Sequence, residues 1–417
     1  MSTVAAPARP PGHPPPLIAP TPPHPAPEIR AVPGDGPGAV LRAVLRDGPL
    51  ARTALARASG LSPAAVSRHT SELLGLGLLR ERPPPAGPPR AGRPQMPVEV
   101  DTGFHAVCGA HIAMDQVTFT LLDLRGGVLA QERIRHRRAA PDVLGRIRTY
   151  LPDFLSRRSG RRSVLGLGVV TGGWVDSERG TVVEHALLGW RDVPVRRALA
   201  PVTRLPVHVD GHARALARAE LLFGAGSGAS DLVQLFVGNV VDAAIATGGG
   251  VLRGRSSGAG DIAHLPLGVP GPRCACGRTG CLQATVSELA LAQRAFDDGL
   301  IEAADFRLLL ARAGDGHPAA LGMFRERLRL VGRAAALLLD VINPELLVVA
   351  EAALVQHPEL LADLHEEVAA RSHLCADPEQ VVVATSFGER VLAVAAGAVV
   401  LDAVYRRPME LRTAASA

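Results

Sequence analysis

The first periodic run of apolar residues predicts three short helices between residues 37 and 75. Helical spacing predicts that residues 38–48 turn Val40, Val44 and Leu45 inward, and that residues 49–59 turn Leu50 and Leu55 inward. Ser62 followed by Pro63 is typical of an N-cap and first helical position, which predicts a third helix ending at Gly75. The inward side chains of this third helix would be Val66, Thr70 and Leu73.

The outward face of the third helix carries small or polar residues, namely Ala64, Ser67, Arg68 and Ser71. Such a face suits a helix that enters the major groove of DNA. Two short strands are expected next, at residues 76–81 and 97–100, joined by a loop rich in Pro, Gly and Arg. Together these elements predict a winged helix-turn-helix.

From Phe104 onward the pattern changes to alternating strands and helices, which indicates an α/β fold. Strands are expected in residues 105–134, turning at 125–127, followed by a helix at 141–158. A second strand-turn-strand pattern in residues 231–254 repeats the first, so two similar halves are predicted. Helices should dominate residues 287–340, followed by a strand at 346–349 and a last helix at about 388–405.

Length and composition indicate two or three structural units in the 417 residues. Residues 1–36 are mostly Pro, Ala and Gly and predict a disordered tail. The expected domains are therefore the tail at 1–36, the winged helix-turn-helix at 37–100, and an α/β domain at 101–417. The chain has five cysteines, and the two outside the cluster at 274–281 lie far apart, which argues against a disulfide framework. Because we also find no signal peptide and no apolar run long enough to span a membrane, we expect a protein of the reducing cytoplasm.

The charge distribution favours DNA as the partner of the N-terminal unit. The chain has no lysine, which excludes a Walker-type phosphate loop. Residues 37–95 hold nine arginines and three acidic residues, an excess of +6 in a protein whose net charge is +5. We expect DNA contacts from the recognition helix, the helix before it and the wing, at Ser62, Ser67, Arg68, Arg52, Arg90 and Arg93. The alternative is a solvated basic face.

A candidate metal site lies in the Gly- and Pro-rich segment 260–285. His264, Cys274, Cys276 and Cys281 offer an imidazole and three thiolates, the ligand set of a closed tetrahedral zinc site. The alternative is that these cysteines are reduced, buried and metal-free. The crowding of three of the five cysteines into eight positions favours Zn²⁺ in a structural role.

Residues 37–417 resemble the ROK family (repressor, open reading frame, kinase) in its winged helix-turn-helix subgroup. The motifs that carry the resemblance are GDIAHLPL with CACGRTGCLQ, LLGWRDVPVRRAL, VHVDGHARALARAE and INPE. The resemblance implies an actin-like, ribonuclease-H-like pair of lobes with a sugar in the cleft. It places His264 and the three cysteines on the family's zinc ligands, with the other ring nitrogen of His264 facing the sugar.

The resemblance also places Asp210 on the family's catalytic base, but the phosphate-binding loops depart from the kinase pattern. Side chains stand where kinases have glycines that approach phosphate, and three of them are acidic, namely Asp115, Asp242 and Glu351. Like charge beside a polyanion costs on the order of 4 kcal/mol per close pair. We therefore expect no ATP binding and regard Asp210 as a vestigial base.

The sugar side departs from the family less completely. Val209 replaces an Asn, Asp261 a Glu, Ala263 a Gly and Gln283 a Glu, so a changed ligand or none is expected. The residues expected to face a ligand come from several segments: Gly172, Gly173, Val209, Asp210, Asp261, His264 and Gln283.

These observations predict a cytoplasmic transcriptional regulator, a repressor of carbohydrate-related genes, with an inactive lobe pair that senses a sugar or sugar phosphate. We expect a homodimer or homotetramer, whose two-fold symmetry would imply a pseudopalindromic operator in double-stranded DNA. One alternative is an ATP-dependent sugar kinase with a DNA-binding extension, and another is a regulator that needs no ligand.

Overall fold

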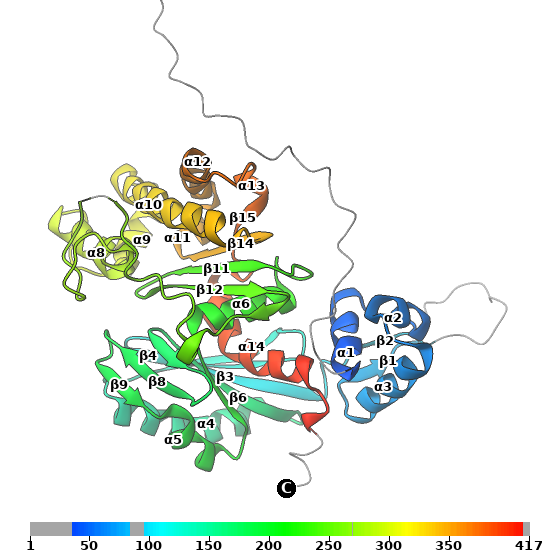
Figure 1. Ribbon diagram of the computed structural model, residues 1–417. Coiled ribbons are helices and arrows are strands. Elements are labelled where there is room, and N and C mark those ends of the chain that lie inside the picture. The colour runs from blue at the N-terminus through cyan, green and yellow to red at the C-terminus, as the bar shows by residue number, and fades with distance from the viewer. Residues whose placement is uncertain (1–35, 84–95, 269, 412–417) are drawn as a thin grey trace, which may run out of the picture.

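The computed structural model describes residues 36–83, 96–268 and 270–411. Within them a small helical unit precedes two α/β lobes that lie one above the other, with the helical unit beside them (Figure 1). The predicted tail falls outside the described residues except for Gly36. The predicted α/β class with an N-terminal winged helix-turn-helix is confirmed.

The helical unit has three helices and a two-stranded antiparallel sheet: α1 (Gly36–Asp47), α2 (Arg52–Ser59), α3 (Pro63–Gly75), β1 (Leu79–Glu81) and β2 (Val98–Val100). The Ser62 hydroxyl accepts a hydrogen bond from the Ala65 amide at 3.3 Å, as expected for an N-cap. All three predicted inward residues of α3 are buried. Leu50 was wrongly placed in the second helix, because its backbone pairs with Val98 as an extended bridge.

The two lobes contain sheets of the same topology. The first comprises β3 (His105–Ile112), β4 (Gln116–Leu122), β5 (Val128–Arg135), β6 (Ser163–Thr171) and β10 (Val207–Gly211). The second comprises β11 (Leu232–Val237), β12 (Val241–Thr247), β13 (Gly250–Val251), β14 (Leu346–Glu351) and β15 (Val382–Ala384). Along the chain, the first three strands of each sheet are antiparallel, and the last two add in parallel beside the first strand. The spatial orders are β10-β6-β3-β4-β5 and β13-β12-β11-β14-β15. The predicted similarity of the two halves is thereby confirmed.

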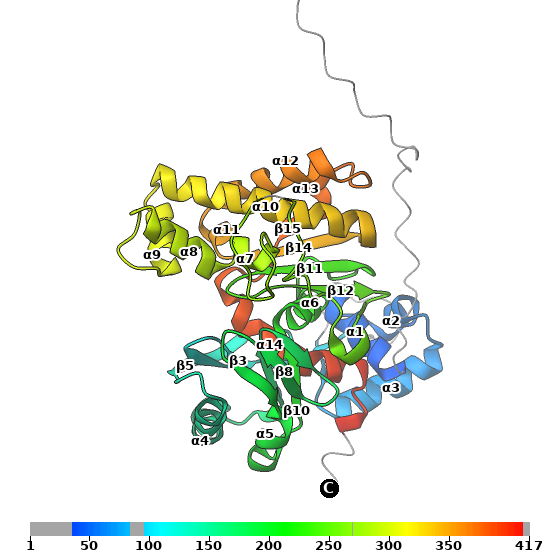
Figure 2. The ribbon, with the colours of Figure 1, turned by 60° about the vertical axis from the view of Figure 1, so that its left-hand side comes forward.

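The outer helices cover the far faces of the two sheets (Figures 1 and 2). The first lobe has α4 (Ala140–Arg158) and α5 (Val195–Thr203), and the second is covered by α8 (Glu288–Asp297), α9 (Phe306–Gly314), α10 (Pro318–Ile342) and α12 (Leu361–Arg371). A small sheet absent from the sequence-based expectations contains β7 (Trp174–Asp176), β8 (Thr181–His185) and β9 (Trp190–Val193).

Two helices lie between the sheets, α6 (His212–Phe223) and α14 (Val391–Arg406) (Figure 2). Glycines let α14 approach the first sheet closely. A Cβ atom added to Gly168 of β6 would lie 1.8 Å from the carbonyl oxygen of Ala396. Any side chain at Gly168 would therefore push α14 away from the sheet.

The winged helix-turn-helix is joined to the first lobe by a shared hydrophobic core. Leu41 and Val44 of α1 belong to the same buried cluster as Leu401 and Val404 of α14. Arginines reinforce this junction at two helix ends, where backbone carbonyls have no partner within the helix. Arg125 of the lobe donates to the Leu45 carbonyl of α1 at 3.1 Å, and Arg42 of α1 donates to the Tyr405 carbonyl of α14 at 3.0 Å. The two units therefore pack as one body.

Among the helices of the described residues, none has the length and apolar character required to cross a membrane.

Replacing Arg125 by Ala should loosen the winged helix-turn-helix without unfolding the lobes. A charge-assisted hydrogen bond contributes about 1.5 to 3 kcal/mol, and here it is lost at a partly buried helix end. We expect faster amide hydrogen exchange in α1 and easier proteolysis near residues 101–104. Arg148→Ala, at an exposed position on α4, is the control and should change neither. Unchanged exchange in α1 of the Arg125 variant would contradict the proposed clamp.

Candidate functional site

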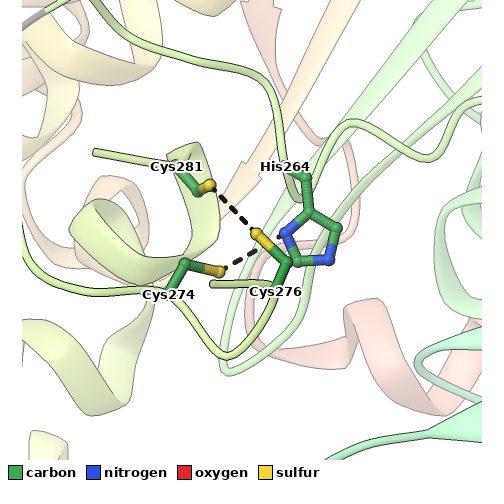
Figure 3. Close-up of side chains that lie close together, drawn as sticks. All are labelled: His264, Cys274, Cys276 and Cys281. Atoms are coloured by element: carbon green, nitrogen blue, oxygen red, sulfur yellow. Dashed lines mark hydrogen bonds between the residues drawn. The ribbon is translucent and has the colours of Figure 1, made fainter. Parts of the chain in front are cut away.

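The four predicted metal ligands come together in one loop cluster (Figure 3). One ligand atom from each of His264, Cys274, Cys276 and Cys281 lies within 4.8 Å of all the others. The loop turns tightly at Gly277, whose φ is 89°, and Cys281 ends it immediately before α7 (Leu282–Val286). The local fold therefore brings these side chains together around one point, as a bound metal requires.

The donor chemistry of this cluster suits a thiophilic metal such as zinc. The Nδ1 atom of His264 lies 3.4 Å from Cys274 Sγ, which leaves Nε2 directed away from the sulfurs. Arg278 donates to Cys276 Sγ at 3.5 Å, and this hydrogen bond lowers the pKa of Cys276 to about 6. Burial raises the pKa of Cys281. A thiolate, the form that binds metal, is thus already favoured at one ligand.

Asp210, near the end of β10, is held by two arginines. It is 1% exposed, its Oδ1 accepts from Arg214 Nε at 2.6 Å, and its Oδ2 accepts from Arg218 at 2.6 Å. Burial alone would raise the pKa of Asp210, but the charges of Arg218 and Arg214 outweigh burial and lower it. A carboxylate held in this way is a poor acceptor for a proton from a substrate hydroxyl.

Arg214 also ties together the segments around Asp210. It donates to the backbone carbonyls of Ser257 and Val175, each at 2.7 Å. Ser256 and Ser257 both adopt positive φ angles, 52° and 56°, so this turn is strained for residues with side chains. Arg214 therefore holds a strained turn of the second lobe against the small sheet of the first.

Two residues expected to face a ligand are turned elsewhere. Val209 is 2% exposed and packs in the hydrophobic core of the first lobe, because alternation along β10 points it to the opposite face from His208. Gln283 accepts a hydrogen bond from the Val241 amide at 3.2 Å, so its carbonyl oxygen serves the backbone. The structure thus does not offer these two side chains to a cleft ligand.

The remaining expected ligand residues stay predictions. Gly172 and Gly173 follow β6, and a Cβ atom added to Gly172 would lie 2.7 Å from a methyl group of Val240 in the other lobe. Asp261 is exposed and accepts from the Ala263 amide at 3.2 Å. The lobes therefore approach each other closely at Gly172, beside the segment that carries Asp261 and His264.

One of the three acidic residues expected to repel nucleotide phosphate is placed differently. Glu351 is buried in an ion pair with Arg327, whose other donors bond the carbonyls of Val286 and Val237. Arg327 therefore compensates the negative charge of Glu351, so Glu351 would not repel a nucleotide phosphate as a free carboxylate would. Asp115 is exposed, and Asp242 is half-buried with its pKa raised to about 7 by burial.

The structure also contains a buried pair of histidines that the sequence analysis does not predict. His111, at the end of β3, and His212, at the start of α6, join Nε2 to Nε2 at 2.8 Å. Burial first, and nearby His185 second, lower the pKa of His111 to about 4. The pair is thus neutral near pH 7. Its signal in the sequence was a histidine near the end of one predicted strand and another directly after a second predicted strand.

The recognition helix presents the predicted polar face. Ser62, Ser67 and Arg68 are exposed, and Arg68 lies 3.4 Å from the Nε2 atom of His69. Arg52, at the start of α2, forms an exposed ion pair with Glu81 of the first wing strand at 3.3 Å. Arg90 and Arg93 fall outside the described residues.

Comparisons with known proteins agree with this architecture. A family model described as ROK family matches residues 107–402, and one described as winged helix-turn-helix DNA-binding matches residues 38–80. A transcriptional regulator of Mycobacterium bovis is 36% identical over 379 residues, covering 87% of this chain and 84% of the relative.

A second relative is the xylose repressor of Caldicellulosiruptor bescii, which is 26% identical and matches 78% of this chain and 85% of its own. The fold is similar to the crystal structure of a ROK family transcriptional regulator, a homologue of the Escherichia coli MLC protein. That similarity has a TM-score of 0.75 at 23% identity and covers 91% of this chain and 100% of the other. With the winged helix-turn-helix, the paired lobes and the His/Cys cluster in place, this chain belongs to the ROK family.

Proposed function

We propose that this protein is a DNA-binding transcriptional regulator whose ROK lobes act as a sensor and not as a kinase. The observation that carries this proposal is a winged helix-turn-helix that exposes the polar face of α3 while α1 is anchored in the core of the lobe. The names of the relatives, a transcriptional regulator and a repressor, support it. We propose repression as the mode and the cytoplasm as the location.

In this proposal α3 enters the major groove of operator DNA. Ser67 and Arg68 read base edges, and Ser62 contacts the backbone beside them while capping the helix. Arg52 would exchange its weak exposed pair with Glu81 for a phosphate. Arg90 and Arg93 are proposed to reach the minor groove from the wing. Two or four copies would bind a pseudopalindromic site.

The metal in this proposal is a structural Zn²⁺ held by His264, Cys274, Cys276 and Cys281. Four protein ligands leave no open position for an activated water, which distinguishes structural from catalytic zinc sites. When bound, the ion would cross-link the loop between η1 (Arg255–Ser257) and α7. His264 would then be fixed with Nε2 free to meet a ligand.

We propose that phosphoryl transfer has been lost. Two buried arginines compensate the charge of Asp210. In the second lobe, Glu351 forms a buried ion pair with Arg327. A sugar or sugar phosphate remains the proposed effector, with Gly172, Gly173, Asp261 and His264 as candidate contacts. Hydrogen bonds from the Gly211 amide, Arg214 and Arg218 already occupy most of the acceptor positions of the Asp210 carboxylate.

A regulator that needs no cleft ligand is the second candidate. It is favoured by Val209 and Gln283, whose side chains serve the core and the backbone. Thermal unfolding of the protein with a panel of sugars and sugar phosphates separates the two candidates. A ligand at 100 times its dissociation constant adds about 2.7 kcal/mol to the free energy of unfolding, whereas no shift with any sugar favours the second candidate.

Arg68→Ala and Arg52→Ala should weaken DNA binding in different ways. Loss of a base contact at Arg68 should cost about 1 to 3 kcal/mol on operator DNA and little on random DNA. Loss of a phosphate contact at Arg52 should weaken both and reduce the slope of log K against log salt by about 1. Fluorescence anisotropy on both DNAs at several salt concentrations measures this. Equal losses on both DNAs for the two variants would contradict these roles.

Cys276→Ser should reduce the metal content and destabilise the second lobe, because one of four ligands is lost. Inductively coupled plasma mass spectrometry of the purified, unchanged protein should find about one zinc ion per chain. Cys375→Ser, at a half-buried cysteine far along the chain from the cluster, is the matched control and should keep the zinc. Helical signal from α1 to α3 should persist after chelation. Equal zinc in both variants would refute the assignment.

The protein should release no ADP from ATP in the presence of a hexose panel, because Asp210 is paired and cannot take the hydroxyl proton. A coupled assay for ADP at high protein concentration measures this directly. Hexose-dependent ADP formation that disappears in Asp210→Asn would instead support the kinase alternative.

A further inference from the structure

A cavity of about 160 Å³ lies between the winged helix-turn-helix and the lobes, away from the cleft discussed above. One side is formed by α1 and α2, and the other by α6, residues 227–230, Gly249 and α14. Any molecule in this cavity touches both units at once. The proposed function makes no use of it.

The walls of the cavity are largely apolar and are kept open by small side chains. The apolar lining residues are Ala39, Ala43, Leu45, Ala58, Leu221, Leu222 and Ala229. An apolar cavity of about 150 Å³ is large enough for one benzene ring. The space therefore suits a compact apolar body of that size.

The polar part of the lining is predominantly cationic. Arg42, Arg46 and Arg406 line the cavity, and Asp402 is the one acidic residue among the lining residues that the structure describes. Asp402 is already held by Arg218 at 3.2 Å and by Arg406 at 2.8 Å. Three arginines against one aspartate give the lining a formal excess of positive charge.

Arg46 is the cation best able to reach a ligand. Its guanidinium pairs with neighbouring Asp47 at 2.8 Å, with both side chains partly in water, at 29% and 43% exposure. Arg46 holds Asp47 through its Nε and Nη2 atoms. Among the described residues no acceptor bonds its Nη1 atom, which can therefore donate to the carboxylate of a ligand. A carboxylate matches the planar donor geometry of a guanidinium.

We propose that this cavity binds a small apolar carboxylate, of about the size of benzoate, between α1 and the lobes. The ring or branched chain occupies the space between the alanines and leucines, and the carboxylate accepts from Arg46. Because the ligand contacts both units, it stabilises the docked arrangement of the winged helix-turn-helix over any detached one. The site thus provides a way for a metabolite to act on the DNA-binding unit without entering the cleft.

Isothermal titration of the full-length protein with benzoate tests this binding without DNA. We expect saturable binding with a dissociation constant of about 1 mM or tighter, and weaker binding of benzyl alcohol, benzylamine and inorganic phosphate. Ala58→Leu should abolish binding, because the larger side chain fills the cavity. Arg46→Gln should weaken it about fivefold, the value of one exposed charge pair.

Ala319→Leu, at an exposed position on α10, is the matched control and should bind benzoate as the unchanged protein does. Hydrogen exchange with benzoate present should slow in α1 and in residues 224–230. The proposal is overturned by an absence of saturable binding, by binding that survives Ala58→Leu, or by protection confined to the cleft. Because no DNA is present, a failure of the DNA-binding proposal would leave this result unaffected.

Discussion

The packing of α1 against α14 is the contact on which the arrangement of the whole protein depends. It places the winged helix-turn-helix and the first lobe in one hydrophobic core, so the recognition helix cannot turn without disturbing α14. Arg125 and Arg42 reinforce this contact at the ends of the two helices, each by donating to a carbonyl of the other unit. Since α14 also lies on the first sheet through Gly168, a change in that sheet has a direct physical route to α1.

Helix α6 connects the ionic network around Asp210 with the junction. Its first turns carry Arg214 and Arg218, which hold Asp210, while its later residues Ala219 and Leu222 belong to the core shared with α1. Buried ion pairs are costly to break, since removing one partner leaves an uncompensated charge. This network therefore fixes the first turns of α6 against Asp210 of β10.

Local patterns in the sequence predicted most of the larger elements and the close approach of the four His and Cys side chains, but not the small sheet of β7, β8 and β9. Helical periodicity and the Ser62 cap determine α3, and the close spacing of Cys274, Cys276 and Cys281 requires a loop that brings their sulfurs together. Interactions between distant segments could not be read in this way. The Arg327–Glu351 pair joins α10 to β14, and the direction of Val209 depends on which face of β10 meets the core. The spacing of Arg214 and Arg218, four and eight residues after Asp210 on one helix, was the available signal for the ionic cluster.

The most direct test of the account is selection of bound sequences from a random duplex DNA library by the purified full-length protein. The account predicts enrichment of one pseudopalindromic motif, with half-sites centred about one helical turn, or a small multiple of it, apart. Enrichment should disappear in Arg68→Ala while binding to bulk DNA persists. Recovery of no motif from the unchanged protein, at a salt concentration where bulk DNA is released, would contradict the account.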